Sequence, residues 1–149
     1  MMSAKNEALL WGSWRMGSWM TENIRTGERL DGLGANPKSF IHYLPDGRMM
    51  VLVLRNDRTA PAGLVPTPQE KVVLYDSMVA YAGTYTFAGD KVLHHIDMSW
   101  NQSWTGSEQT RFCHLDGAML RIKSPPSKNP LDGEEVIHDI LFEKVTHLR

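Results

Sequence analysis

Short runs in which apolar and polar residues alternate follow one another along most of the chain. Because successive side chains of a strand point to opposite faces, this alternation predicts strands with one buried face. Dipeptides that favour tight turns, Asp46-Gly47, Gly89-Asp90 and Asp116-Gly117, separate several of these runs and predict hairpins. The predicted strands span residues 9–20, 38–45, 48–55, 83–88, 91–100, 107–115, 118–124 and 134–144.

The segment that follows residue 66 has a different pattern. Thr67, Pro68 and Glu70 stand where a helix N-cap, a first-turn proline and the third residue of a capping box belong. Apolar residues follow at helical spacing, and Gly83 can end the run. We therefore predict one helix near residues 68–81.

These elements indicate an all-β fold. Eight strands joined mainly by hairpins are better accommodated in a closed barrel than in an open sheet, because closure removes exposed strand edges. We predict an eight-stranded antiparallel up-and-down barrel with one inserted helix, and a two-layer sandwich is the alternative. The length of 149 residues is typical of one domain, so we assign residues 1–149 to a single barrel domain.

Hairpin register sorts side chains between the inside and the outside of this barrel, because residues opposite each other in an antiparallel pair share a face. A two-residue turn in the second hairpin pairs Tyr85 with His94, and one in the third hairpin pairs Cys113 with Leu120. The other face of both hairpins is polar and therefore faces solvent. Together with the alternation of the last strand, this sorting places five polar residues inside: Tyr85, His94, Gln109, Arg111 and His138.

Two apolar segments complete the interior. In the first strand, Trp14 faces inward and closes one end of the barrel, while Gly12 lets neighbouring backbone come close. Trp11 and Trp19 share the other parity and are interpreted as lid or surface contacts. The hairpin of residues 38–55 is apolar on both faces, so the pattern does not show which face lines the lumen. The helix that follows it would cover the outer face.

Composition and charge limit the class of partner. Sixteen Lys and Arg residues stand against 17 Asp and Glu, which provides no basic face for nucleic acid or for an anionic membrane. No apolar run is long enough to cross a bilayer, and the first residues lack the apolar core of a secretory signal. With a single cysteine as well, the chain is expected in the cytoplasm.

The predicted interior combines apolar walls with a few polar groups. Arg111 needs a carboxylate, carbonyl groups, water or an acidic ligand there, because an unpaired buried cation is too costly. His94 opposite Tyr85 could act as general base and acid, or these groups could simply form a structural hydrogen-bond network. His42, His94 and His138 could converge on zinc, although no local spacing supports this and we assign no metal. Phosphate-binding loops are absent, so no cofactor is predicted.

The chain carries Gly12-x-Trp14 within LLWGSWRM, followed in order by YLPDGRMMV, AYAGTYTF, VLHHIDMSWNQSWTGSEQTRF and LDGAMLRI. Together these stretches resemble the lipocalin-like domain family of the calycin superfamily. The resemblance covers residues 9–144 and implies a calycin-type barrel with an internal pocket. Related calycins bind hydrophobic molecules, and some relatives act as cyclases or isomerases. Lipocalins usually stack an arginine on the first-strand tryptophan, but Lys144 stands at that place and lacks the planar guanidinium.

The leading functional hypothesis is binding of a hydrophobic small molecule with a polar or acidic head inside the barrel. The ligand-binding candidates are Arg111, Gln109, His94, Tyr85, His138 and Trp14. The alternative is a cofactor-independent isomerase or cyclase of a small substrate, with His94 and Tyr85 as the catalytic candidates. A third hypothesis is a barrel filled by its own side chains that serves only in assembly. A homodimer is compatible with all three.

Overall fold

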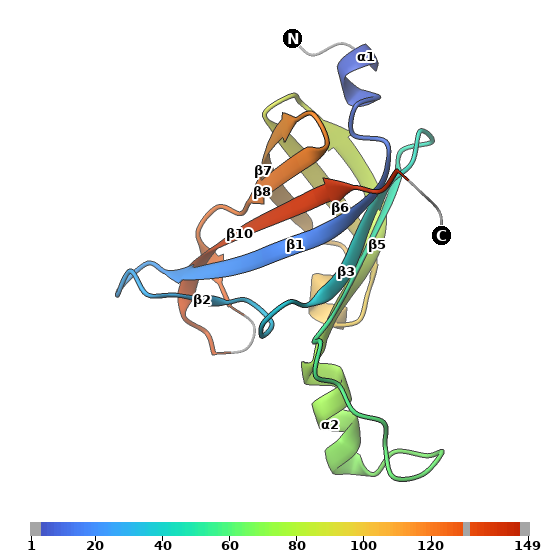
Figure 1. Ribbon diagram of the computed structural model, residues 1–149, viewed down its shortest axis with the longest axis vertical. Helices are drawn as coiled ribbons and strands as arrows, with labels where there is room; N and C mark the ends of the chain where they lie inside the picture. The colour runs from blue at the N-terminus through green and yellow to red at the C-terminus, as the bar shows by residue number, and fades with distance from the viewer. Residues whose placement is uncertain (1–3, 130–131, 147–149) are drawn as a thin grey trace.

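Eight antiparallel strands form a closed barrel in the computed structural model, which describes residues 4–129 and 132–146 (Figure 1). Each strand pairs with the next around the barrel, and pairing between the first and the last closes it. The barrel strands are β1 (Gly12–Asn23), β3 (Lys38–Tyr43), β4 (Arg48–Leu54), β5 (Met78–Phe87), β6 (Lys91–Ser99), β7 (Glu108–Asp116), β8 (Met119–Lys123) and β10 (Glu135–Lys144). The predicted eight-stranded barrel is confirmed, and closure excludes the open sandwich.

Short elements border this barrel. Strand β2 (Arg29–Asp31) pairs with β1, and β9 (Ser127–Lys128) pairs with β10. The helices are α1 (Ala4–Glu7), α2 (Pro68–Asp76) and the 3-10 helix η1 (Gln102–Trp104). None of the helices within residues 4–129 and 132–146 has the length and apolar composition needed to span a bilayer.

Helix α2 begins where the sequence predicts but ends five residues earlier. The capping box is present, with Thr67 and Glu70 each accepting a hydrogen bond from the other's backbone N–H. Residues 78–81 belong to β5 instead, because they pair with β4. No residue of α2 is buried, and the helix projects beyond one end of the barrel (Figure 1). The expectation that it covers the hairpin of residues 38–55 is therefore wrong.

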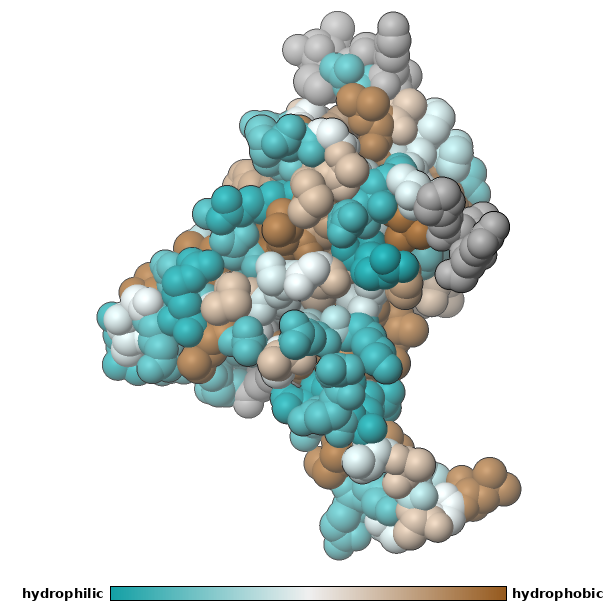
Figure 2. Space-filling model, viewed as in Figure 1, coloured by the Kyte–Doolittle hydropathy of each residue, from teal (hydrophilic) through white to brown (hydrophobic). Residues whose placement is uncertain are grey.

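The segment that leads into α2 is similarly exposed. Leu64 and Val65 are both solvent-exposed, at 99% and 76%. Figure 2 shows apolar surface at the far tip of the projection that these segments form. Neither this segment nor α2 contributes to the core of the barrel.

The observed register of two hairpins shows whether their side chains lie on the predicted inner and outer faces. Tyr85 pairs with His94, as predicted. In the hairpin of β7 and β8, Cys113 pairs with Ile122 rather than with Leu120, because the turn lies at residues 117–118 and Gly117 supplies the positive φ of 60°. This shift of two residues leaves every side chain on its predicted face, since the strand period is two.

The first hairpin has a three-residue loop, which the sequence analysis did not predict. Tyr43 pairs with Met49, not with Met50 as a two-residue Asp46-Gly47 turn would require, and Gly47 adopts a φ of 91° at the end of the loop. In this register, shifted by one residue, the buried residues of both strands share one face and the exposed residues share the other. The buried lumen face carries Ile41, Tyr43, Met49, Val51 and Val53, whereas Phe40, Met50 and Leu52 are exposed outside.

Trp14 closes the barrel end opposite α2, as predicted. Its side chain is 1% exposed, and its indole Nε1 donates a 2.8 Å hydrogen bond to the carbonyl of Leu10. The ammonium of Lys144 lies 4.7 Å from the centroid of this indole and donates to the carbonyl of Trp11. A cation–π contact therefore replaces the guanidinium stacking, and burial lowers the pKa of Lys144.

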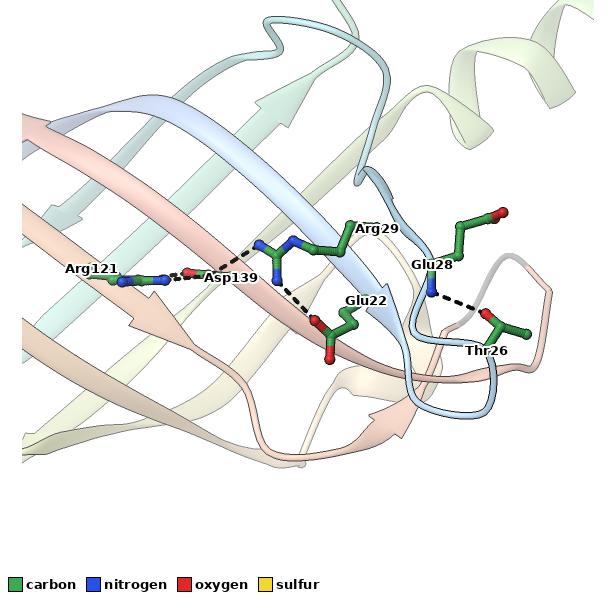
Figure 3. Close-up of polar contacts among 6 residues, drawn as sticks. All are labelled: Glu22, Thr26, Glu28, Arg29, Arg121 and Asp139. Carbon is green, nitrogen blue, oxygen red and sulfur yellow. Dashed lines mark hydrogen bonds and ion pairs between the residues drawn. The ribbon is translucent and has the colours of Figure 1, made fainter.

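A chain of ion pairs on the outer surface connects β2 to the barrel (Figure 3). Asp139 on β10 accepts hydrogen bonds of 2.9 and 2.6 Å from Arg121 and one of 3.4 Å from Arg29. Arg29 also donates to Glu22 at 3.0 Å. These contacts fix the β2 segment, which leads directly to Leu33 at the barrel opening.

Candidate functional site

The barrel encloses a cavity of about 140 Å³ toward the end from which α2 projects. A cavity needs roughly 10–15 Å³ to hold one water-sized group, so this volume holds about ten such groups. Ile41, Val51 and Val53 of β3 and β4 form an apolar wall. The polar groups come from Tyr81, His94, Arg111 and His138 of β5, β6, β7 and β10, and from Ser124, which follows β8. The barrel is therefore not filled throughout by its own side chains.

His94 lies at the centre of the polar wall between two tyrosine hydroxyls. Its Nε2 is 2.7 Å from Tyr43 Oη, and its Nδ1 is 2.8 Å from Tyr81 Oη. The ring is 1% exposed, and burial, followed by the charge of Arg111, lowers the pKa of His94 well below its ordinary value. A neutral imidazole donates through one nitrogen and accepts through the other, so one tyrosine donates to His94 and the other accepts from it.

Tyr85 is not the hydrogen-bond partner of His94, although the two residues pair in the sheet. Its hydroxyl donates to the carbonyl of Leu44 at 2.7 Å, and its ring packs edge-on against Tyr43. The long side chain thus extends toward the turn between β3 and β4, at the closed end. Tyr81, which is not among the five polar residues predicted inside, is buried in the lumen and takes this position at His94.

Arg111 lines the cavity as predicted. Its guanidinium donates a 3.1 Å hydrogen bond to the carbonyl of Thr110, and the ion pairs found in residues 4–129 and 132–146 do not include it. Its positive charge contributes to lowering the pKa of both His94 and His138. The three predicted residues Arg111, His94 and His138 therefore come together around one cavity.

His138 connects the polar wall to Trp19. Its Nδ1 lies 3.1 Å from the indole Nε1 of Trp19, which donates to it, and 3.2 Å from the hydroxyl of Thr21. Its backbone N–H donates to Ser124 Oγ at 2.8 Å. Burial, followed by the charge of Arg111, lowers the pKa of His138 to about 4, so the ring is neutral at pH 7.

Three other predicted site residues do not line this cavity. Trp14 and Tyr85 face inward but lie at the closed end, and Gln109 donates from Nε2 to Ser107 Oγ at 3.1 Å. The three-histidine zinc hypothesis is wrong, because His42 lies outside the barrel, stacked on Phe40. Within the part of the chain that the structure describes, no group of three potential protein ligands could hold a metal ion.

Aromatic rings form a row from the surface to the polar wall, which the sequence analysis missed. Tyr75 packs on Trp100, Trp100 on Trp104, and Trp104 on Tyr81, with centroid distances of 6.3, 5.4 and 5.7 Å. All four line the cavity. The two tryptophans four residues apart in SWNQSW were the signal available, because this pattern begins at the end of a predicted strand.

Trp19 also lines the cavity, and the adjacent loop holds it there. A Cβ atom on Gly32 would lie 2.3 Å from the Trp19 ring, so only glycine lets the backbone pass this close. Strand parity set Trp19 apart from inward-facing Trp14, but the register shift between Met16 and Ser18 breaks that parity, so the expectation of a lid or surface contact is wrong and Trp19 faces the cavity. The next residue, Leu33, is buried and lines the same end of the cavity.

A family described as a lipocalin-like domain matches residues 11–145. A lipocalin-like protein from Bacteroides uniformis is similar at 14% identity, with a TM-score of 0.49, covering 92% of this chain and 99% of that one. An uncharacterized protein from Bacteroides eggerthii is similar at 12% identity, with a TM-score of 0.45, covering 91% and 99%. No curated protein matches the chain.

Proposed function

The chain belongs to the lipocalin-like domain family, and from this premise we propose that it binds an apolar small molecule with a polar or acidic head inside its barrel. The fold suggests ligand binding in general, and the finer assignment rests on the cavity. We place the head of the ligand at Arg111 and His94 and its apolar body against the wall formed by β3 and β4. The proposed setting is the cytoplasm.

One observation carries this proposal. Arg111 lies at a largely apolar cavity, yet no carboxylate among the described residues pairs with it. Keeping a cation at such a position is costly unless another group compensates it. A ligand with a polar or acidic head would supply that group, and its body would gain about 0.8 kcal/mol for each methylene-sized group removed from water.

A cofactor-independent isomerase is the second candidate, favoured by the contacts of His94. The series Tyr43–His94–Tyr81 could transfer a proton to or from a molecule in the cavity, with Tyr81 in the role first assigned to Tyr85. Keto–enol conversion of phenylpyruvate, followed by ultraviolet absorbance, tests this candidate. Acceleration by the wild type that is lost in Tyr81→Phe would favour the isomerase over simple binding.

The binding proposal is tested by titration with cinnamate and cinnamamide. Each has about eleven non-hydrogen atoms, which matches a cavity for about ten water-sized groups. Binding of either should move the indole N–H resonances of Trp19 and Trp104, which line the cavity, and leave that of Trp14 at the closed end unchanged.

Matched variants locate the bound molecule. Val51→Phe should fill the cavity and abolish binding of both compounds, since Val51 lines it. Leu52→Phe introduces the same side chain at the neighbouring exposed position and should bind like the wild type. Circular dichroism confirms that both variants fold. Unimpaired binding by folded Val51→Phe, or failure of both compounds to bind the wild type, would refute the proposal.

A further inference from the structure

The polar wall of the cavity presents mainly hydrogen-bond donors. The guanidinium of Arg111 can only donate; the carbonyl of Thr110 accepts one of its N–H groups, and the hydroxyl of Tyr81 is a second acceptor beside it. Ser124 Oγ accepts from the backbone N–H of His138, so its own hydrogen remains for another acceptor. The side chains of Arg111 and Ser124 both line the cavity. A ligand head that fits these groups must therefore supply acceptors.

The contacts of His138 determine which of its ring nitrogens carries the proton. An indole N–H has no lone pair to offer, so Nδ1 of His138 must accept from Trp19 and is unprotonated. The single proton of the neutral ring is consequently on Nε2. Among the described residues, none accepts a hydrogen bond from this Nε2–H, and the His138 side chain lines the cavity. It is a second donor, fixed in orientation by Trp19.

The charges around the cavity favour a head with one negative charge. Arg111 is the one cationic side chain among the described lining residues, and both lining histidines are neutral at pH 7. Asp76 at the opening adds a negative charge, which disfavours a second charge on the ligand. A carboxylate supplies one negative charge and two planar acceptor oxygens, which match the planar donors of a guanidinium.

The aromatic row favours a flat ligand body. Tyr75, Trp100 and Trp104 lead from exposed α2 to Tyr81 at the polar wall, and Trp19 lies at the same end of the barrel. Aromatic rings pack on one another in offset or edge-to-face arrangements. A planar aromatic body therefore gains more binding free energy than the burial of its surface area alone provides.

We propose that this cavity selects a monoanionic aromatic carboxylate. The carboxylate binds between the Arg111 guanidinium and the Nε2–H of His138, and the ring lies along the row of Trp100, Trp104 and Tyr81. This inference rests on the proposed function, since it assumes that a ligand enters the cavity. It adds the chemical class of the head, the nature of the body and the role of His138 as a donor.

The experiment compares cinnamate with cinnamamide, which has the same shape without the charge. Dissociation constants are measured by calorimetry for the wild type, Arg111→Ala, His138→Leu and His138→Gln. A hydrogen bond to a charged group is worth about 1.5–3 kcal/mol, so the wild type should bind cinnamate roughly tenfold or more tightly than cinnamamide. Arg111→Ala and His138→Leu should lose most of this preference. His138→Gln should keep it, because glutamine can accept from Trp19 and donate into the cavity.

The outcomes separate this inference from the proposed function. Equal affinity of the wild type for the two compounds would overturn the carboxylate assignment and leave cavity binding supported. Full preference for cinnamate in folded His138→Leu would overturn the role of His138. Binding of neither compound would refute the proposed function and this inference together.

Discussion

Mild acid should destabilise this barrel through its buried histidines. His138 has a pKa of about 4 in the folded protein and about 6.5 in an unfolded chain, so the unfolded state binds more protons between these values. The corresponding stability is fully present above about pH 6.5 and is lost as the pH falls toward about 4. His94, whose pKa is lowered in the same direction, adds to the loss.

The magnitude follows from the shift of His138. Its linkage alone should remove about 2 kcal/mol of unfolding free energy between about pH 7 and pH 5. Arg121 holds the pKa of the Asp139 carboxyl below its usual value. Stability from this ion pair is present above the ordinary carboxyl pKa and is lost only as the pH falls through the lowered one. The histidine effect therefore occurs at higher pH than the carboxylate effect.

Urea denaturation followed by far-ultraviolet circular dichroism at several pH values measures this effect. His138→Gln should lose about 2 kcal/mol less than the wild type over the same pH interval, because its side chain does not titrate. His114→Gln, which changes an exposed histidine on the outer face of β7, should behave like the wild type. An identical pH dependence in His138→Gln and the wild type would refute the assignment of a buried, neutral His138.

Two further changes test packing at the site. Tyr43→Phe leaves Nε2 of buried His94 without its partner and should reduce the unfolding free energy by about 1–3 kcal/mol, measured by urea denaturation; wild-type stability would show that this hydrogen bond contributes nothing net. Gly32→Ala should displace the Trp19 ring and shift its indole N–H resonance, whereas Gly63→Ala, with no atom within 4 Å of its Cβ, should not; an unmoved Trp19 resonance would contradict the close approach.

The fold was predictable because turns and alternation agree over most of the chain. The interior positions of His94, Arg111 and His138 depend on which face a residue occupies, and an even error in register does not change the face. This is why the two-residue shift between β7 and β8 did no harm. The one-residue shift in the first hairpin did change the assignment of faces. A two-residue loop would pair each residue with one that points to the opposite face in the observed three-residue-loop hairpin.

The end of α2 could not be read from its own residues. Local sequence near residue 78 is compatible with either helix or strand, and pairing with β4 decides in favour of strand. The apolar residues of α2 predict a face that covers the barrel, but amphipathic spacing does not specify what a helix packs against. In this protein α2 has no buried residue at all.

The site shows a more specific limit of reasoning from alternation. Parity states that a side chain points into a barrel, but not at which level along its axis. Trp14 and Tyr85 point inward at the closed end, whereas Arg111 and His138 point inward at the cavity. The tilt of the strands sets these levels, and it follows from closure of the whole sheet, a property that no single hairpin contains. The sheet partner of His94 is Tyr85, but the tyrosine of β5 whose hydroxyl contacts His94 is consequently Tyr81, four residues earlier in the strand.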